Sequence, residues 1–296
     1  MKSSSLYVVM PTTRGVKAFP SIHSALSQKG FSSVKVLICG KSANDELFIS
    51  ECGRNFDDSV LILPCAKKEK VLPGEARNIG LEYIAARKSP GDYLLFLDDD
   101  IYLPSDYAWK LKEFLATFGQ VAAMGKIVSK PVNIWSKIID YSNFWWLQLE
   151  HDRPDLGWLG TGATLIECCY ATAVRFRPDV AVNEDVIFFA QIEKISGKHL
   201  GICANTRCYH CHDRGSFLGL LRYQFNNGRR GINYRLDKRK ALYASYKRWG
   251  TYSKSAIKAN FKYLKKNVLI LFGISFSFLI FEFGAIYGTF KNKVRT

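Results

Sequence analysis

The sequence predicts an α/β fold in which a mostly parallel sheet is flanked by helices. Short apolar runs alternate with helical patterns over the first half of the chain, which is typical of parallel sheets. The apolar runs are nearly continuous, as expected for strands covered on both faces. The 296 residues are 48% hydrophobic and 23% charged, so the chain can bury a full core and wholesale disorder is excluded.

The strands expected in the first half are residues 6–10, 34–39, 59–63 and 93–97, each closed by proline, glycine or aspartate. The expected helices are residues 19–28, residues 75–87 and one that starts at 103–106, where Pro104 favours a helix start. Ligands of parallel sheets bind beyond the carboxyl ends of the strands. Segments 12–14, 40–42 and 98–100 are therefore expected at one edge of the sheet.

The second half of the chain has a different pattern. Residues 135–149 are rich in aromatic side chains. A turn and strand are expected at 160–167, a helix at 184–196 and a strand at 200–208. Two basic helices are expected at 216–230 and 241–266, before an apolar tail.

Positive charge is concentrated in one segment. The net charge is +16, and residues 207–266 contain 16 basic and two acidic side chains. Such a segment favours partners that carry phosphate: nucleic acid, anionic lipid or a phosphorylated substrate. Because the segment adjoins the apolar tail, anionic lipid is the favoured partner and nucleic acid is not expected.

The apolar tail, residues 267–290, has 16 apolar residues and three glycines among 24, with one charge at Glu282. As a helix it would be about 36 Å long, enough to cross a bilayer. The alternatives are a helix that lies in the membrane interface and a buried core helix. Seven basic residues precede the tail within 247–266 and three follow it, which predicts residues 1–266 on the cytoplasmic side of a membrane. The N-terminus has no secretory signal pattern, so the eight cysteines are expected to be reduced.

Carboxylates mark two candidate sites. Asp98, Asp99 and Asp100 directly follow the apolar run YLLFL. Neighbouring carboxylates repel one another unless a cation lies between them, and oxygen ligands suit Mg²⁺ or Mn²⁺. The alternative is a solvated acidic turn. Glu184 and Asp185 open a predicted helix, where acids compensate the helix dipole or leave one carboxylate as a general base.

The segment from Cys208 to His212 reads Cys-Tyr-His-Cys-His, which matches a haem-attachment signature and a fragment of a zinc site. No secretory signal supports haem, and no second Cys/His pair stands at zinc-finger spacing. A simpler interpretation is a strand whose Cys208, His210 and His212 share one face.

Six segments together resemble the family 2 glycosyltransferases of GT-A fold, over residues 5–231. They are VVMPTTRG at 8–15, GEARNIG at 74–80, LLFLDDD at 94–100, WLGTGATLI at 158–166, NEDVIFF at 183–189 and YHCHDRGSFLGLLRYQFNNGRRG at 209–231. Each segment alone is a weak signal, and their common order and spacing make the resemblance specific.

The resemblance implies roles for particular residues. The donor side would comprise Pro11, Thr12, Thr13, Arg14, Arg77, Asn78, Asp98 and Asp99. The acceptor side would comprise Gly160, Thr161, Gly162, Glu184, Trp145 and Trp146, although the two tryptophans could instead contact a membrane. Divalent Mn or Mg would be held by Asp98, Asp100 and either His210 or His212, and phosphates would meet Arg222, Arg229 and Arg230. Asp185 would be the catalytic base.

The resemblance further implies an inverting single displacement, which moves a hexose from a nucleoside-diphosphate sugar to a saccharide or lipid-linked acceptor. The family usually has an aspartate just after its second strand, but here the chain reads ICGKS. A UDP-sugar is favoured, and guanosine and thymidine sugars stay open. The competing interpretation is a non-catalytic, membrane-bound protein that binds nucleotides or polyanions.

The expected organisation has three parts. They are a catalytic domain at 1–231, a basic juxtamembrane region at 232–266 and a transmembrane or membrane-embedded helix at 267–290. The catalytic domain would face the cytoplasm at the cytoplasmic membrane.

Overall fold

The computed structural model describes residues 4–65, 71–144, 147–148, 151–156, 159–178, 180, 184–212, 215–230 and 268–291. The chain divides into two compact units. Unit 1 comprises residues 1–126 and 150–209, and unit 2 comprises residues 127–149 and 210–296. The domain boundaries expected at 231 and 266 border residues outside the described part of the chain.

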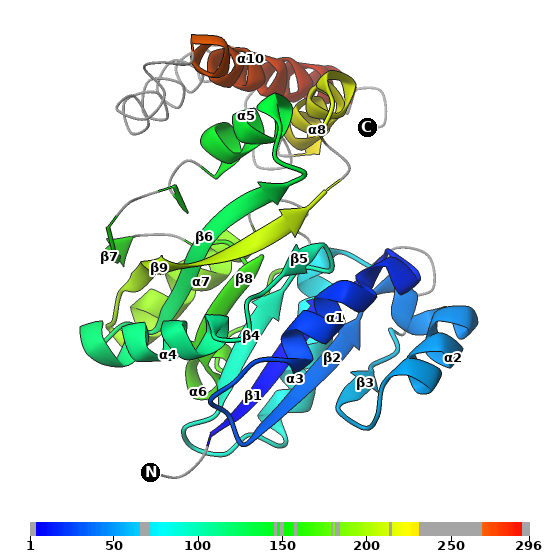
Figure 1. Ribbon diagram of the computed structural model, residues 1–296, viewed down its shortest axis with the longest axis vertical. Helices are drawn as coiled ribbons and strands as arrows, with labels where there is room; N and C mark the ends of the chain where they lie inside the picture. The colour runs from blue at the N-terminus through cyan, green and yellow to red at the C-terminus, as the bar shows by residue number, and fades with distance from the viewer. Residues whose placement is uncertain are drawn as a thin grey trace. The chain divides into compact units, whose positions relative to one another are not determined.

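A single sheet forms the centre of unit 1 (Figure 1). Its strands are β1 (Ser5–Pro11), β2 (Ser33–Cys39), β3 (Val60–Ile62), β4 (Tyr93–Leu97), β5 (Ile101–Tyr102), β6 (Ala122–Lys130), β7 (Arg153–Leu156), β8 (Ala163–Glu167) and β9 (Leu200–Cys211). The order is β3-β2-β1-β4-β8-β6-β9-β5, and β7 pairs with β9. Strands β6 and β9 end in unit 2.

The first four strands of this order are parallel, because β1 pairs in parallel with both β2 and β4, and β2 with β3. Strand β8 is antiparallel to both β4 and β6. The predicted α/β fold with a mostly parallel sheet is confirmed, and the antiparallel pairs lie in the half of the sheet built from the second part of the chain.

Helices cover both faces of the parallel strands. In Figure 1, α1 (Phe19–Leu26) lies in front of the sheet and α3 (Pro73–Ala85) lies behind it. A Cβ atom at Gly80 would lie 2.7 Å from Cγ2 of Val9, so glycine lets α3 approach β1 closely. This close packing fixes the start of α3, where Arg77 lies. The other α-helices described in unit 1 are α2 (Glu46–Asn55), α4 (Tyr107–Phe118), α6 (Cys168–Ala171) and α7 (Glu184–Ser196).

Aromatic packing ties α7 to the sheet. Phe176 and Phe188 stack with ring centroids 4.1 Å apart, and Phe96 of β4 meets both rings edge-on. All three side chains are buried, so this contact holds the start of α7 near the carboxyl end of β4.

Unit 2 contains three described helices, α5 (Ile134–Asn143), α8 (Phe217–Arg230) and α10 (Val268–Lys291). Asn133 caps α5, since its side chain accepts a hydrogen bond of 2.9 Å from the backbone N–H of Ser136. Ile138 and Ile139 of α5, Leu220 of α8, and Ile270 and Ile274 of α10 form the buried core of this unit. The predicted helices at 216–230 and 267–290 are confirmed, and the one predicted at 241–266 lies outside the described residues.

Candidate functional site

Loops at the carboxyl ends of β1, β2 and β4 meet at one edge of the sheet. The N–H of Thr12 donates to the carbonyl oxygen of Cys39 at 2.8 Å, and the N–H of Ser42 donates to that of Thr12 at 3.1 Å. Asp99, in the loop after β4, accepts hydrogen bonds from both Thr12 and Thr13. Segments 12–14, 40–42 and 98–100 therefore lie together, as the strand-end rule predicts.

Asp99 turns its carboxylate toward the first strand and anchors the acidic loop there. Its Oδ2 accepts hydrogen bonds from the Thr12 hydroxyl at 2.6 Å and from the Thr13 N–H at 3.1 Å. Burial raises the pKa of Asp99, and these two hydrogen bonds oppose that effect by stabilising the charged form. Asp99 therefore fixes the loop after β4 to the end of β1, and its neighbours Asp98 and Asp100 do not take part in these two hydrogen bonds.

We expect Thr12→Val to lower the free energy of unfolding by about 1.5–3 kcal/mol, because the buried Asp99 carboxylate loses a charged hydrogen bond while side-chain shape is kept. Chemical denaturation measures this change. Thr117→Val is the matched control, since the Thr117 hydroxyl is exposed and bonds only within its own helix. Equal destabilisation by the two variants would contradict the anchoring role of Thr12.

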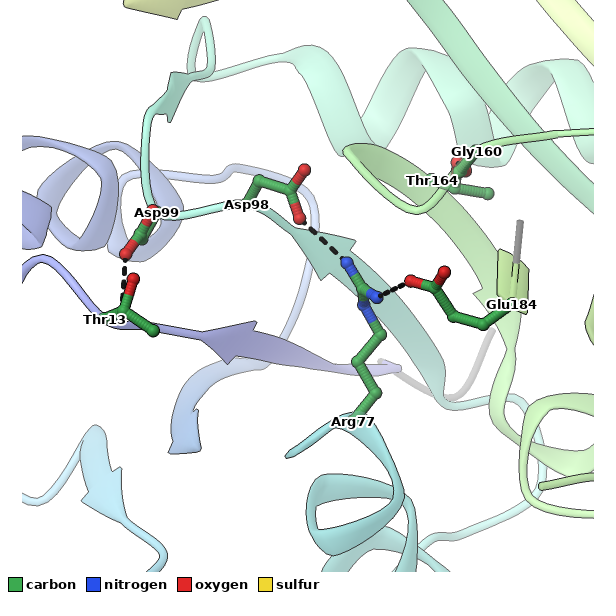
Figure 2. A network of polar contacts seen from close by, with 7 residues as sticks. All are labelled: Thr13, Arg77, Asp98, Asp99, Gly160, Thr164 and Glu184. Carbon is green, nitrogen blue, oxygen red and sulfur yellow. Dashed lines mark hydrogen bonds and ion pairs between the residues drawn. The ribbon is translucent and has the colours of Figure 1, made fainter. Parts of the chain in front are cut away.

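Arg77 joins two carboxylates that are far apart in sequence (Figure 2). One of its terminal nitrogens lies 3.0 Å from Oδ1 of Asp98, and the other lies 2.9 Å from Oε1 of Glu184. The Arg77 side chain is only 5% exposed, whereas that of Asp98 is 41% exposed. A buried guanidinium therefore connects the acidic loop after β4 with the first residue of α7.

Asp185 follows Glu184 on the first turn of α7. The pKa of Asp185 is raised to about 6, because burial disfavours its charged form and the Glu184 carboxylate repels it. Its Oδ1 accepts a hydrogen bond of 2.8 Å from the N–H of Val186. A carboxylate that is ionised near neutral pH yet retains basicity suits a general base.

The Gly-Thr-Gly stretch before β8 approaches both acidic positions. A Cβ at Gly160 would lie 3.5 Å from Oδ2 of Asp185, and one at Gly162 would lie 3.6 Å from Oδ2 of Asp98. The Asp98 N–H also donates to the Gly162 carbonyl oxygen at 2.9 Å. Thr161 between them is buried. This backbone thus passes beside the carboxylates of Asp98 and Asp185.

Two carboxylates of the acidic loop could hold a divalent cation. Asp98 and Asp100 stand at a strand end, and Oδ2 of Asp100 lies 3.7 Å from Arg14. Within the described part of the chain, no three His, Cys, Asp or Glu side chains converge as a preformed metal site. Mg²⁺ typically binds through one or two carboxylates, water and substrate phosphates, so a two-carboxylate site fits a cation that arrives with a diphosphate.

His210 and His212 belong to unit 2, where a buried polar network surrounds them. Nε2 of His212 lies 2.9 Å from the Ser129 hydroxyl, which also makes a short hydrogen bond to Asp140. The ring of His210 lies edge-on to that of His212, with centroids 4.8 Å apart. Burial raises the pKa of Asp140 to about 6. Residue burial alternates along this part of β9, which confirms the simple strand interpretation of Cys208, His210 and His212. Their predicted role toward a metal stays a prediction.

The other predicted site residues lie in unit 1, in unit 2 or outside the described residues. Asn78 holds the backbone of Phe176 through two hydrogen bonds of 2.9 Å, a contact that the sequence did not reveal. Pro11 ends β1. Arg222 and Arg229 lie on α8 in unit 2, and the Arg230 side chain, Trp145 and Trp146 lie outside the described residues.

Solved structures show which fold this is. TarS of S. aureus superposes with a TM-score of 0.52 at 13% identity, over 79% of this chain and 40% of TarS. TarS 1–349 in complex with UDP has a TM-score of 0.51 at 12% identity, over 95% of this chain and 90% of that one. GalNAc-T7 with UDP, GalNAc and Mn²⁺ has a TM-score of 0.50 at 12% identity, over 71% of this chain and 43% of that one. This chain has the GT-A fold. These similar proteins are glycosyltransferases.

The GT-A fold accounts for the position of the acidic loop, since it places the loop after β4 at the edge where β1 and β2 also end. No family model and no curated protein matches the sequence. The chain spans less than half of TarS and of GalNAc-T7, at 40% and 43% of their lengths.

Proposed function

We propose that this chain is an inverting glycosyltransferase. It transfers a hexose from a nucleoside-diphosphate sugar to a saccharide or lipid-linked acceptor, at the cytoplasmic face of a membrane. The support is the contact between Arg77, Asp98 and Glu184, which joins the loop expected to bind the donor to the helix that carries Asp185. The UDP in similar structures favours a UDP-sugar as donor.

Asp185 acts as the base in the proposed reaction. Its carboxylate removes the proton from the acceptor hydroxyl, and the resulting oxygen attacks the anomeric carbon of the donor. The bond from that carbon to the diphosphate oxygen breaks on the opposite face, so the configuration inverts. The raised pKa of Asp185, about 6, lets the carboxylate be ionised at neutral pH and still accept a proton.

The donor is held at the carboxyl ends of β1, β2 and β4. Asp98 and Asp100 would hold Mn²⁺ or Mg²⁺, which supplies positive charge to the departing diphosphate. Thr12, Thr13 and Asp99 keep this loop in place. Arg77 offsets part of the negative charge of Glu184 and Asp98, which reduces the repulsion that an anionic donor meets near Asp185.

We expect Asp100→Ala to abolish metal-dependent binding of the nucleotide, because it removes one of the two carboxylates proposed to hold the cation. The measurement is the thermal shift produced by UDP and UDP-sugars, with Mn²⁺ and with EDTA. Asp155→Ala removes an exposed carboxylate of the same unit and serves as the control. Wild-type shifts in the Asp100→Ala variant would show that the metal site is assigned to the wrong residues.

A further inference from the structure

The two sides of helix α10 differ in the size and polarity of their residues. The segment Val268–Gly288 has a mean hydropathy of 2.2, sufficient in length and composition to cross a membrane. Two of its polar side chains nevertheless point inward, since Ser277 is fully buried and Glu282 is 5% exposed. Large apolar side chains point outward: Val268, Leu269, Phe272, Leu279, Phe283 and Tyr287 are between 36% and 72% exposed.

The inward side is occupied by the other helices of unit 2. A Cβ at Gly228 of α8 would collide with the Phe281 carbonyl oxygen, and one at Gly284 would collide with that of Phe225. At the other end, a Cβ at Gly273 would collide with Ile138 of α5. Small residues therefore let α10 contact α8 and α5 along most of its length, as Figure 1 shows for these three helices.

Hydrogen bonds reinforce this inward side. Gln224 of α8, which is 1% exposed, donates to the Ser277 hydroxyl, and that hydroxyl lies 3.2 Å from the Ser142 hydroxyl of α5. The polar side chains that would be costly in hydrocarbon are thus satisfied by protein. Removing α10 from α8 and α5 would take these partners from the Ser277 hydroxyl, while Gln224 and Ser142 would keep their hydrogen bonds to Asn143.

The outward residues form one continuous surface. They recur at steps of three, four and seven residues, which places them on a single stripe of the helix. Phe276 links the stripe to α8, because its ring lies 6.3 Å from those of both Phe272 and Phe217. Phe217 and Leu218 of α8 are 43% and 60% exposed. We call these two residues and the six outward residues of α10 the outer patch.

A transmembrane arrangement would conflict with this packing. If α10 crossed a bilayer, α8 would enter the hydrocarbon with it and carry Arg222, which is exposed, and Arg229, which is half-buried, into the membrane. An arginine at the centre of a bilayer is strongly disfavoured. A helix of 14 residues is also only about 21 Å long, too short to cross.

The charges at both ends of α10 also favour a helix that lies flat. Seven basic residues precede it within 247–266, Lys291 is its last residue, and Lys293 and Arg295 follow it. If the helix lies in the interface, both groups meet the same leaflet, where each contributes attraction to anionic lipid. We infer that α10 lies in the plane of an anionic membrane surface, with the outer patch among the acyl chains, and does not cross the bilayer. This inference rests on the membrane location in the proposed function.

The side of the membrane on which each end of the chain lies tests the inference directly. The chain carries one tag at each end and is expressed in a bacterial host, and protease is added to inverted membrane vesicles with and without detergent. In these vesicles the cytoplasmic face is outside, so a flat helix exposes both tags to digestion. Protection of the C-terminal tag until detergent is added would overturn the inference in favour of a crossing helix, while the membrane location would stand.

A second arm tests lipid contact by the outer patch. We expect Phe272→Asp to reduce flotation with vesicles of phosphatidylcholine and phosphatidylglycerol at least about tenfold, because a charge replaces an apolar group among the acyl chains. Leu47→Asp is the matched control, since both side chains are 70% exposed and Leu47 lies on α2 of unit 1. Vesicles of phosphatidylcholine alone should bind the wild type more weakly.

Equal flotation of both variants, or no flotation of the wild type, would overturn the inference. Sugar transfer to a soluble acceptor is measured in the same preparations. Activity without flotation would leave the proposed enzyme intact and remove only its membrane location.

Discussion

Asp185→Asn is expected to reduce sugar transfer by about 100-fold or more, while binding of the nucleotide donor is retained. The amide has nearly the shape of the carboxylate but cannot accept the acceptor proton. Single-turnover transfer and donor titration measure the two effects separately. Asp155→Asn, at an exposed aspartate of unit 1, should leave both unchanged.

The pH dependence of the same reaction gives a second readout. Because the pKa of Asp185 is raised to about 6, wild-type transfer should increase about tenfold per pH unit below that value and level off above it. This increase of the rate with pH should be absent from the residual activity of Asp185→Asn. Equal loss of donor binding and transfer would contradict the role of a base and place Asp185 among donor-binding or structural residues.

Arg77→Met is expected to lower the free energy of unfolding by about 3–5 kcal/mol. Methionine keeps the apolar stem but leaves the buried Glu184 carboxylate and Asp98 without their cation. Urea denaturation followed by far-UV circular dichroism measures the loss. Transfer should fall as well, because both the donor loop and the start of α7 lose their common contact.

Two further variants separate this pairing from a general effect of removing an arginine. Arg54→Met breaks the exposed pair with Glu51, which should cost less than about 1 kcal/mol. Adding Glu184→Gln to Arg77→Met should recover part of the lost stability, because one uncompensated charge disappears. Additive destabilisation by Arg77→Met and Glu184→Gln would contradict the pairing.

The position of the acidic loop could be predicted from sequence, because an apolar run that ends in Asp98 places the carboxylates at a strand end. The contacts within the site could not. Arg77 and Glu184 are separated by 107 residues, and their pairing depends on Gly80 packing against Val9 and on Phe176 stacking on Phe188. The resemblance assigns Asp99 to the donor side, and only the fold shows that its carboxylate turns toward Thr12.

Several elements also escaped prediction for physical reasons. The apolar pattern of β8 indicates a strand but carries no information about its direction, so the antiparallel pair with β4 was not foreseen. Helix α5 was not predicted, because residues 135–149 were identified only as rich in aromatic side chains, although Ile134, Ile138 and Ile139 recur at helical spacing. The tail was recognised as apolar, but its inward face of small and polar residues becomes meaningful only beside α8.

Turnover of the donor tests the proposed enzyme most directly. Purified full-length chain is incubated with UDP-, GDP- and TDP-sugars, with Mn²⁺ or with EDTA, and released nucleoside diphosphate is measured. We predict slow release from one of these donors that requires the metal, disappears in Asp100→Ala and becomes faster when a saccharide acceptor is added. No release and no binding of any donor, from a folded protein supplied with Mn²⁺, would contradict the assignment as a glycosyltransferase.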